Sequence, residues 1–247
     1  MSRSKRKSYH HGDLRRALLD EARKLVEDEG PSAVSFRKLA EALDVSHAAP
    51  LAHFRERLSL DAALATEAFR EVRTRCEDLR IPPPGGRAWS GGPHASYQAM
   101  AAPAAAPLPA TPASSPRPEL GLLAMRLVTA ALVYLRFALE HPGLFRVMYA
   151  PELSERLRGA ADAPSPDADF RELAEEKARA LEVFATLVRQ GQEVGEFRRE
   201  LRAEQAARLV LALTEGLAHQ YLEEKTGIGR LKEAERLLEL FMRGILG

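Results

Sequence analysis

Apolar residues recur every three or four positions through the first 80 residues, which is the spacing of an amphipathic helix. The first stripe contains Leu14, Leu18, Ala22, Leu25 and Val26, and it ends at Gly30-Pro31. We predict a short helix after Ser35, whose side chain is a typical N-cap, and a second short helix that Ser46 caps and that reaches Phe54. A longer helix is predicted over residues 57–80.

The same spacing continues through residues 119–247. It predicts a strongly apolar helix over residues 120–140, stopped by His141-Pro142-Gly143, and then two short helices, the second opened by Pro151. A helix that follows a break at residues 163–167 is expected to close at Gly191 and Gly195, and two more helices span about 203–224 and 230–246. No stretch alternates as a strand does, so the predicted fold class is all-α.

Residues 82–118 differ from both halves in composition. They hold ten of the sixteen prolines and few large apolar side chains. Proline at this density interrupts helices, and little apolar burial is available to offset the entropy of an ordered backbone. We predict a disordered Pro/Ala/Gly-rich insert that separates an N-terminal domain, residues 1–80, from a C-terminal domain, residues 119–247.

Charge narrows the possible partners. The formal net charge is +1, from 36 Lys plus Arg and 35 Asp plus Glu, so binding to a polyanion must come from a local patch. The strongest basic patch is the N-terminal arm, where one carboxylate, Asp13, accompanies Arg3, Lys5, Arg6, Lys7, Arg15 and Arg16. The single cysteine, Cys76, excludes internal disulfides and is expected to be an inert thiol. With no apolar run as long as a membrane span and no secretory signal, we expect a cytoplasmic protein without membrane contact.

The stretch from Ser35 to Phe54, SFRKLAEALDVSHAAPLAHF, pairs the two short helices across a turn of about three residues. Ala40 at their crossing permits close approach, and nearby apolar side chains supply a shared core. This pattern is typical of a helix-turn-helix, whose second helix lies in the major groove of DNA. The exposed residues of that second helix are expected to be Ser46, His47, Ala48, Ala49, Leu51 and His53.

The flanking sequence strengthens this interpretation. HHGDLRRALLDEARKLVEDEG, SFRKLAEALDVS and HFRERLSLDAALA, in this order and spacing, resemble the N-terminal domain of the TetR (tetracycline-repressor-like) family over about residues 9–75. The resemblance implies an N-terminal helix-turn-helix DNA-binding domain and a C-terminal helical domain for ligand binding and dimerisation. It therefore implies a ligand-responsive transcriptional regulator, expected to be a repressor that binds a palindromic double-stranded DNA operator as a homodimer.

On this resemblance, the phosphate contacts are assigned to Lys5 and Arg6 of the arm, Arg37, Lys38 and Arg57, with Ser46 and nearby amides at the start of the second helix. His47 is the expected base contact, and Arg37 and His53 are further candidates. Leu51 and the alanines offer only apolar contacts.

The sequence departs from the common family pattern in the insert at residues 82–118, in Arg57-Leu58 where Lys-Glu is common, and at three positions between the two short helices and within the second. Asp44 occupies the turn position usually held by glycine, which calls for a left-handed conformation. Leu51 stands where a phosphate-binding tyrosine is usual, and Pro50 lies inside the expected recognition helix.

The second half is similar to the C-terminal domain of the family. LEVFATLVRQGQEVGEFR and EQAARLVLALTEGLAHQYL resemble the paired dimerisation helices, so we expect helices 168–192 and 203–224 to form a four-helix bundle with a second copy. HPGLFRVMYAPEL resembles a C-terminal class named for a Trp-His-Gly signature, of which Gly216 is retained and Glu215 replaces the histidine. The candidate ligand-binding residues are Phe137, Phe145, Met148, Tyr149, Phe184, Leu213 and His219.

Two other classes of protein compete with this interpretation, a helical enzyme and a helical binding or interaction protein. No nucleophile-base pair, phosphate loop, metal-ligand set or cofactor motif stands out, so we expect neither an enzyme nor a bound metal or cofactor. A helical small-molecule-binding or interaction protein with a degenerate helix-turn-helix is the alternative, and salt-dependent DNA binding separates the two.

Overall fold

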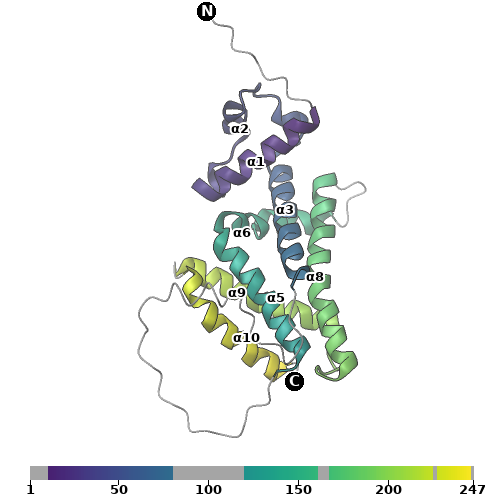
Figure 1. Ribbon diagram of the computed structural model, residues 1–247. Coiled ribbons are helices and arrows are strands. Elements are labelled where there is room, and N and C mark those ends of the chain that lie inside the picture. The colour runs from purple at the N-terminus through teal and green to yellow at the C-terminus, as the bar shows by residue number, and fades with distance from the viewer. Residues whose placement is uncertain (1–10, 80–119, 161–166, 225–226, 246–247) are drawn as a thin grey trace, which may run out of the picture. The chain divides into compact units, whose positions relative to one another are not determined.

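The computed structural model describes residues 11–79, 120–160, 167–224 and 227–245. Every element in these ranges is a helix, as Figure 1 shows, and no strand occurs in them. The all-α fold class is therefore confirmed. The predicted insert at residues 82–118 and the arm residues Lys5 and Arg6 lie outside the described residues.

The chain forms two compact units, each of which contains residues from before and after the segment 82–118. One unit contains the described residues within Met1–Thr74 and Phe137–Leu181, and the other contains those within Arg75–Arg136 and Glu182–Gly247. Helices α3 (Arg57–Glu77), α5 (Leu122–Glu140) and α8 (Ala168–Val194) each supply residues to both units. The division into two functional domains stays a prediction.

The first unit contains α1 (His11–Glu29), α2 (Phe36–Ala42), α6 (Pro142–Met148) and α7 (Pro151–Ala160), with parts of α3, α5 and α8. Two 3₁₀ turns, Pro31–Ala33 and Pro50–Ala52, lie on either side of α2. The predicted apolar stripe of α1 is buried, because its members share one face of the helix. The buried side chains of this unit include Leu18, Leu39, Phe54, Leu60 and Leu64.

Helices α1 and α6 meet at a glycine. A Cβ atom on Gly143 would lie 2.2 Å from the carbonyl oxygen of Val26, so any larger residue would collide with the backbone of α1. Beside this crossing, Nδ1 of His141 lies 2.8 Å from a carboxylate oxygen of Glu27. The sequence His141-Pro142-Gly143 thus ends α5, starts α6 and brings α6 onto α1.

The second unit contains α9 (Ala203–Glu223), a 3₁₀ turn (Gly227–Arg230) and α10 (Leu231–Ile245), with parts of α3, α5 and α8. The start of α5 is capped from elsewhere in the chain: the Glu196 carboxylate accepts hydrogen bonds from the backbone N–H groups of Leu123 and Ala124, at 2.9 and 3.1 Å. A carboxylate at this place satisfies free N–H groups and complements the helix dipole. Glu196 therefore fixes where α5 begins.

The sequence interpretation of the end of α8 was wrong at one glycine. Gly195 does close the helix, with a positive φ of 81°, but Gly191 lies inside it. A Cβ atom on Gly191 would lie 2.1 Å from the ring of Phe197, which packs back on the helix. Position 191 therefore requires a glycine, because a side chain there would collide with the ring of Phe197.

Helix α5 is the one helix in the described ranges that is long and apolar enough to cross a membrane by length and composition. Half of its apolar window is buried inside the protein, including Leu127, Leu135 and Phe137. Its apolar face is thus used for packing, as in the core helix of a folded domain.

Candidate DNA-binding site

Helix α2 begins and ends as the sequence predicts. The Ser35 side chain accepts a hydrogen bond from the backbone N–H of Lys38 at 3.2 Å, which caps the helix. At the other end, Asp44 has a φ of 51°, and the Val45 N–H donates to the carbonyl of Ala40 at 3.0 Å. A left-handed residue followed by this bond is a common helix C-cap, so Asp44 takes the place of the usual glycine.

The predicted helix over residues 46–54 is wrong as an α-helix. Residues 46–49 form turns and Pro50–Ala52 a single 3₁₀ turn, with hydrogen bonds from Ala49 N–H to Ser46 and from His53 N–H to Pro50. Proline has no N–H to donate to the carbonyl of Ser46, and its ring would crowd that carbonyl. The bonds of Ala49, Ala52 and His53 reach three residues back instead of four, and the Phe54 N–H reaches four residues back to the carbonyl of Pro50.

This segment is still firmly anchored. The Pro50 and Phe54 side chains are buried, and the Arg15 guanidinium lies 4.7 Å from the centre of the Phe54 ring. Ser46, His47, Ala48 and Leu51 are exposed, and Ala49 and His53 are half-buried. We call residues 46–53 the recognition segment. It presents small and polar side chains to solvent on a buried base.

The cations assigned to phosphates differ in how they are held. Arg37 is 81% exposed and pairs with Glu41 at 2.9 Å, while the Lys38 ammonium pairs with Glu29 at 2.7 Å. The pair with Arg37 lowers the pKa of Glu41, and His47 of the recognition segment contributes to the same lowering. Arg37, Glu41 and His47 thus belong to one exposed charged surface.

Arg57 lies in a different environment from the one that the sequence suggested. Its guanidinium donates to the backbone carbonyls of Val34 and Pro31, the latter at 2.8 Å, and pairs with Asp61 at 2.8 Å. Burial raises the pKa of Asp61, although Arg57 opposes this shift. Arg57 therefore ties α3 to the segment that precedes α2.

Sequence reasoning missed Arg55. Its side chain is exposed directly after the recognition segment, and within the described residues it has no ion-pair partner. The signal was present in the sequence, because Arg55 directly follows the buried Phe54, but the family pattern drew attention to Arg57 instead.

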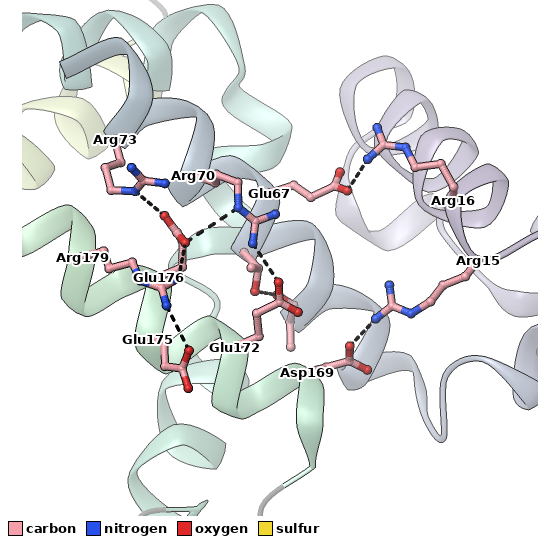
Figure 2. Close-up of polar contacts among 12 residues, drawn as sticks. Arg15, Arg16, Glu67, Arg70, Arg73, Asp169, Glu172, Glu175, Glu176 and Arg179 are labelled. Atoms are coloured by element: carbon pink, nitrogen blue, oxygen red, sulfur yellow. Dashed lines mark hydrogen bonds and ion pairs between the residues drawn. The ribbon is translucent and has the colours of Figure 1, made fainter. Parts of the chain in front are cut away.

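Arg15 and Arg16, counted with the basic arm, are paired inside the first unit. Arg15 pairs with Asp169 of α8, and Arg16 pairs with Glu67 of α3 at 2.6 Å (Figure 2). Arg16 also pairs with Asp20 on its own helix, at 2.6 Å. Burial raises the pKa of Asp169, although Arg15 opposes this shift. These two arginines hold α1 in place.

The candidate ligand-binding residues fall into both units. In the first, Phe145 and Tyr149 lie with their ring centres 4.9 Å apart, Tyr149 meets Phe69 of α3 at 6.0 Å, and Phe137 and Met148 are buried. In the second, Phe184 is buried against Tyr134, Leu213 is half-buried and His219 is exposed. The structure thus brings Phe145 and Tyr149 together, and it places His219 on the surface of α9.

Cys76 is buried in α3, with its sulfur 3.6 Å from the carbonyl oxygen of Ala130. Burial raises the pKa of this thiol to about 12. Because the thiolate is the reactive form, this environment is that of an unreactive thiol.

An all-α fold in which α2 is followed by a tight turn and an exposed recognition segment is the arrangement expected of a helical DNA-binding regulator. Comparison with known families makes the class specific: residues 18–64 match the bacterial regulatory proteins of the tetR family, and residues 127–245 match the tetracyclin repressor-like C-terminal domain. The chain belongs to the TetR family of transcriptional regulators. It is accordingly a ligand-responsive, DNA-binding regulator of a family that points to a non-enzymatic role.

Solved structures agree with this fold. A protein of unknown function from Rhodococcus sp. RHA1 is 25% identical, with a TM-score of 0.63 over 98% of this chain and 100% of that one. A tetR-family regulatory protein from Rhodococcus RHA1 is 18% identical, with a TM-score of 0.58 over 93% and 95%. The regulator PfmR from Thermus thermophilus is 20% identical, with a TM-score of 0.56 over 92% and 97%. No curated protein matches the sequence. The Trp-His-Gly subclass stays a prediction.

Proposed function

We propose that this protein is a cytoplasmic repressor that binds a palindromic operator as a homodimer and releases it when a small molecule binds. The observation that supports this most directly is the recognition segment, which presents Ser46, His47 and Ala48 from a buried base after the left-handed turn at Asp44. Small side chains let the backbone approach DNA, and two copies related by a two-fold axis would fit half-sites one helical turn or more apart.

Base edges are read by His47, with Arg37 and His53 as further candidates, and Leu51 and the alanines contact thymine methyl groups. Phosphates are met by Ser46, Arg37, Lys38, Lys5 and Arg6, to which we add Arg55. Arg57 holds the chain before α2 in position rather than contacting DNA, because its guanidinium is engaged by the backbone carbonyls of Val34 and Pro31.

The dimer interface is proposed on α9 and α10. These helices pack on each other and expose Leu209, Leu237 and Leu240, which are 43%, 39% and 60% accessible. Apolar side chains in such positions favour α9 with α10 over the pairing of α8 with α9 that the sequence suggested. Gly216 lies on the exposed side of α9, and a Cβ atom there would meet nothing within the protomer.

Gly216→Ala tests that interface. A mid-helix glycine costs about 1 kcal/mol relative to alanine, so the change should stabilise an isolated protomer. If a second copy approaches closely at Gly216, the same change weakens dimerisation, measured by sedimentation equilibrium. Gly159→Ala is the matched control, because Gly159 is also exposed, helical and open. Equal dimerisation of both variants would place the interface elsewhere.

The effector response is proposed to pass through α3, which starts beside the recognition segment. This helix also carries Phe69, which together with Phe145 and Tyr149 forms what we call the aromatic cluster. A difference of about 1–3 kcal/mol between the ligand-free and ligand-bound states is enough for regulation. The candidate pocket residues in the first unit are Phe137, Phe145, Met148 and Tyr149.

One observation favours the alternative, a small-molecule-binding protein with a degenerate helix-turn-helix: the recognition segment is a 3₁₀ turn rather than an α-helix. Selection of bound DNA from a random pool, followed by a salt titration, decides between the two. The repressor selects a palindrome and loses affinity steeply as salt rises, since phosphate contacts release counterions. His47→Ala should relax the preference at one base pair in each half-site. A protein that selects no sequence at low salt is the alternative.

A further inference from the structure

Lys177 of α8 occupies an unusual place for an ammonium group. Its Nζ atom lies 5.7 Å from the centre of the Phe69 ring and 5.5 Å from the centre of the Tyr149 ring. The side chain is half-buried, and so is Tyr149, while Phe69 and Phe145 are buried. All four residues belong to the first unit. A cation thus sits at the edge of an aromatic cluster where solvent still reaches it.

The glutamates nearest to Lys177 in the sequence are already paired with arginines, as Figure 2 shows. Glu172 holds Arg70 at 2.7 Å, Glu175 holds Arg179 at 3.2 Å, and Glu176 holds Arg73 at 2.5 Å and Arg179 at 3.1 Å. The three arginines balance the three carboxylates. Lys177 is left over, and among the described residues no carboxylate pairs with it.

An ammonium in this position has lost part of its water and has only ring faces in exchange. A cation–π contact at a site that solvent reaches is weak, whereas a hydrogen bond between two opposite charges is strong. An incoming carboxylate would therefore gain a partner with which no other carboxylate of the described residues is paired, and the rings of Phe69 and Tyr149 would cover the apolar part of the same molecule.

We propose that Lys177, with Phe69 and Tyr149, is the anchor for the effector, and that the effector is an organic acid with an aromatic or aliphatic body. This inference rests on the proposed function, since it names the ligand class of the sensor. Phe69 belongs to α3, so a ligand held at Lys177 touches the helix whose start is tied by Arg57 to the segment before α2.

The test compares 3-phenylpropionate with 3-phenylpropionamide, which has nearly the same shape without the charge. Binding to the full-length protein is measured by calorimetry without DNA, and thermal unfolding serves as the second readout. The acid should bind and raise the unfolding midpoint, and the amide should do neither. Lys177→Met should weaken binding of the acid by about tenfold or more, while Lys177→Arg retains it.

Lys24→Met is the matched control, because Lys24 is an exposed lysine of α1 and its loss changes the net charge equally. Equal binding of acid and amide, no binding of either, or unchanged acid binding by Lys177→Met would each overturn the proposal. Operator binding by the ligand-free protein is measured separately. Its absence would contradict the proposed function and leave the result for the acid standing.

Discussion

Two groups of arginines in the first unit lie in opposite environments. Around the recognition segment, Arg37 has a single exposed partner and Arg55 has none among the described residues. Between α3 and α8, Arg70, Arg73 and Arg179 gather on Glu176, whose side chain is completely buried (Figure 2). An exposed pair is easily exchanged for a phosphate, whereas removing one partner of a buried pair leaves a charge without compensation. We call the second group the α3–α8 seam.

The comparison separates cations that can bind DNA from cations that hold the protein together. Arg57 and Arg15 belong with the seam in this respect, since both are engaged by groups of the protein itself. A basic residue near a helix-turn-helix is therefore not a DNA contact by position alone.

The largest effect is expected for Glu176→Ala. Three arginines would lose a shared carboxylate, and removing one side of a buried ion pair costs up to about 3 kcal/mol of the free energy of unfolding, since water partly compensates the exposed Arg70 and Arg179. Chemical denaturation measures it. Glu175→Ala is the control, because Glu175 is exposed and, among the residues that the structure describes, pairs with Arg179 of its own helix alone. Equal losses in the two variants would show that the seam is not special.

Arg57→Ala and Arg55→Ala form the next pair. Loss of two charge-assisted bonds to carbonyls should make Arg57→Ala less stable by about 2 kcal/mol, while Arg55→Ala should unfold like the wild type. In DNA binding the larger effect is expected for Arg55→Ala. This variant should reduce the magnitude of the negative slope of log affinity against log salt by about 1. Arg171→Ala, at an exposed position of α8, corrects for net charge. If Arg57→Ala is as stable as the wild type and has a shallower salt dependence, Arg57 contacts a phosphate, as the sequence suggested.

The pH dependence of stability gives a smaller test of the seam. Burial opposes ionisation of Glu176, but hydrogen bonds from Arg73 and Arg179 outweigh burial and leave its pKa below the usual value of 4.5. The unfolded chain then binds a proton more readily, so this stabilisation is present above the unfolded pKa and is lost as pH falls through the folded pKa. Glu176→Gln should therefore show a shallower fall in unfolding free energy between about pH 5 and pH 3, measured by denaturation at each pH. Parallel curves would contradict this.

The smallest effect is expected at the turn. Asp44 holds a φ of 51°, which glycine adopts at less cost, so Asp44→Gly should stabilise the protein by about 0.5 kcal/mol. It also removes a negative charge beside the recognition segment and should raise DNA affinity. Asp44→Asn keeps the tolerance for this conformation and removes only the charge, so the two variants separate the conformational from the electrostatic effect.

Much of the fold could be predicted because it depends on local rules. Ser35 as a cap, Gly30-Pro31 as a stop and the periodic apolar faces all act within one or two helical turns. The seam could not be predicted, because Arg73 and Glu176 are separated by 103 positions and nothing in the local sequence pairs them. The recognition segment could be predicted only in part. Pro50 indicated that an α-helix is unfavourable there, but the family pattern suggested one.

The crossing of α6 over α1 has a mechanical consequence. At Gly143 the two backbones touch, with no intervening side chain whose rotamer could change to absorb a displacement. A sideways displacement of α6 would therefore displace α1 by nearly the same amount. Replacing Gly143 with alanine would place a methyl group between the two helices and keep them further apart, with or without a bound effector.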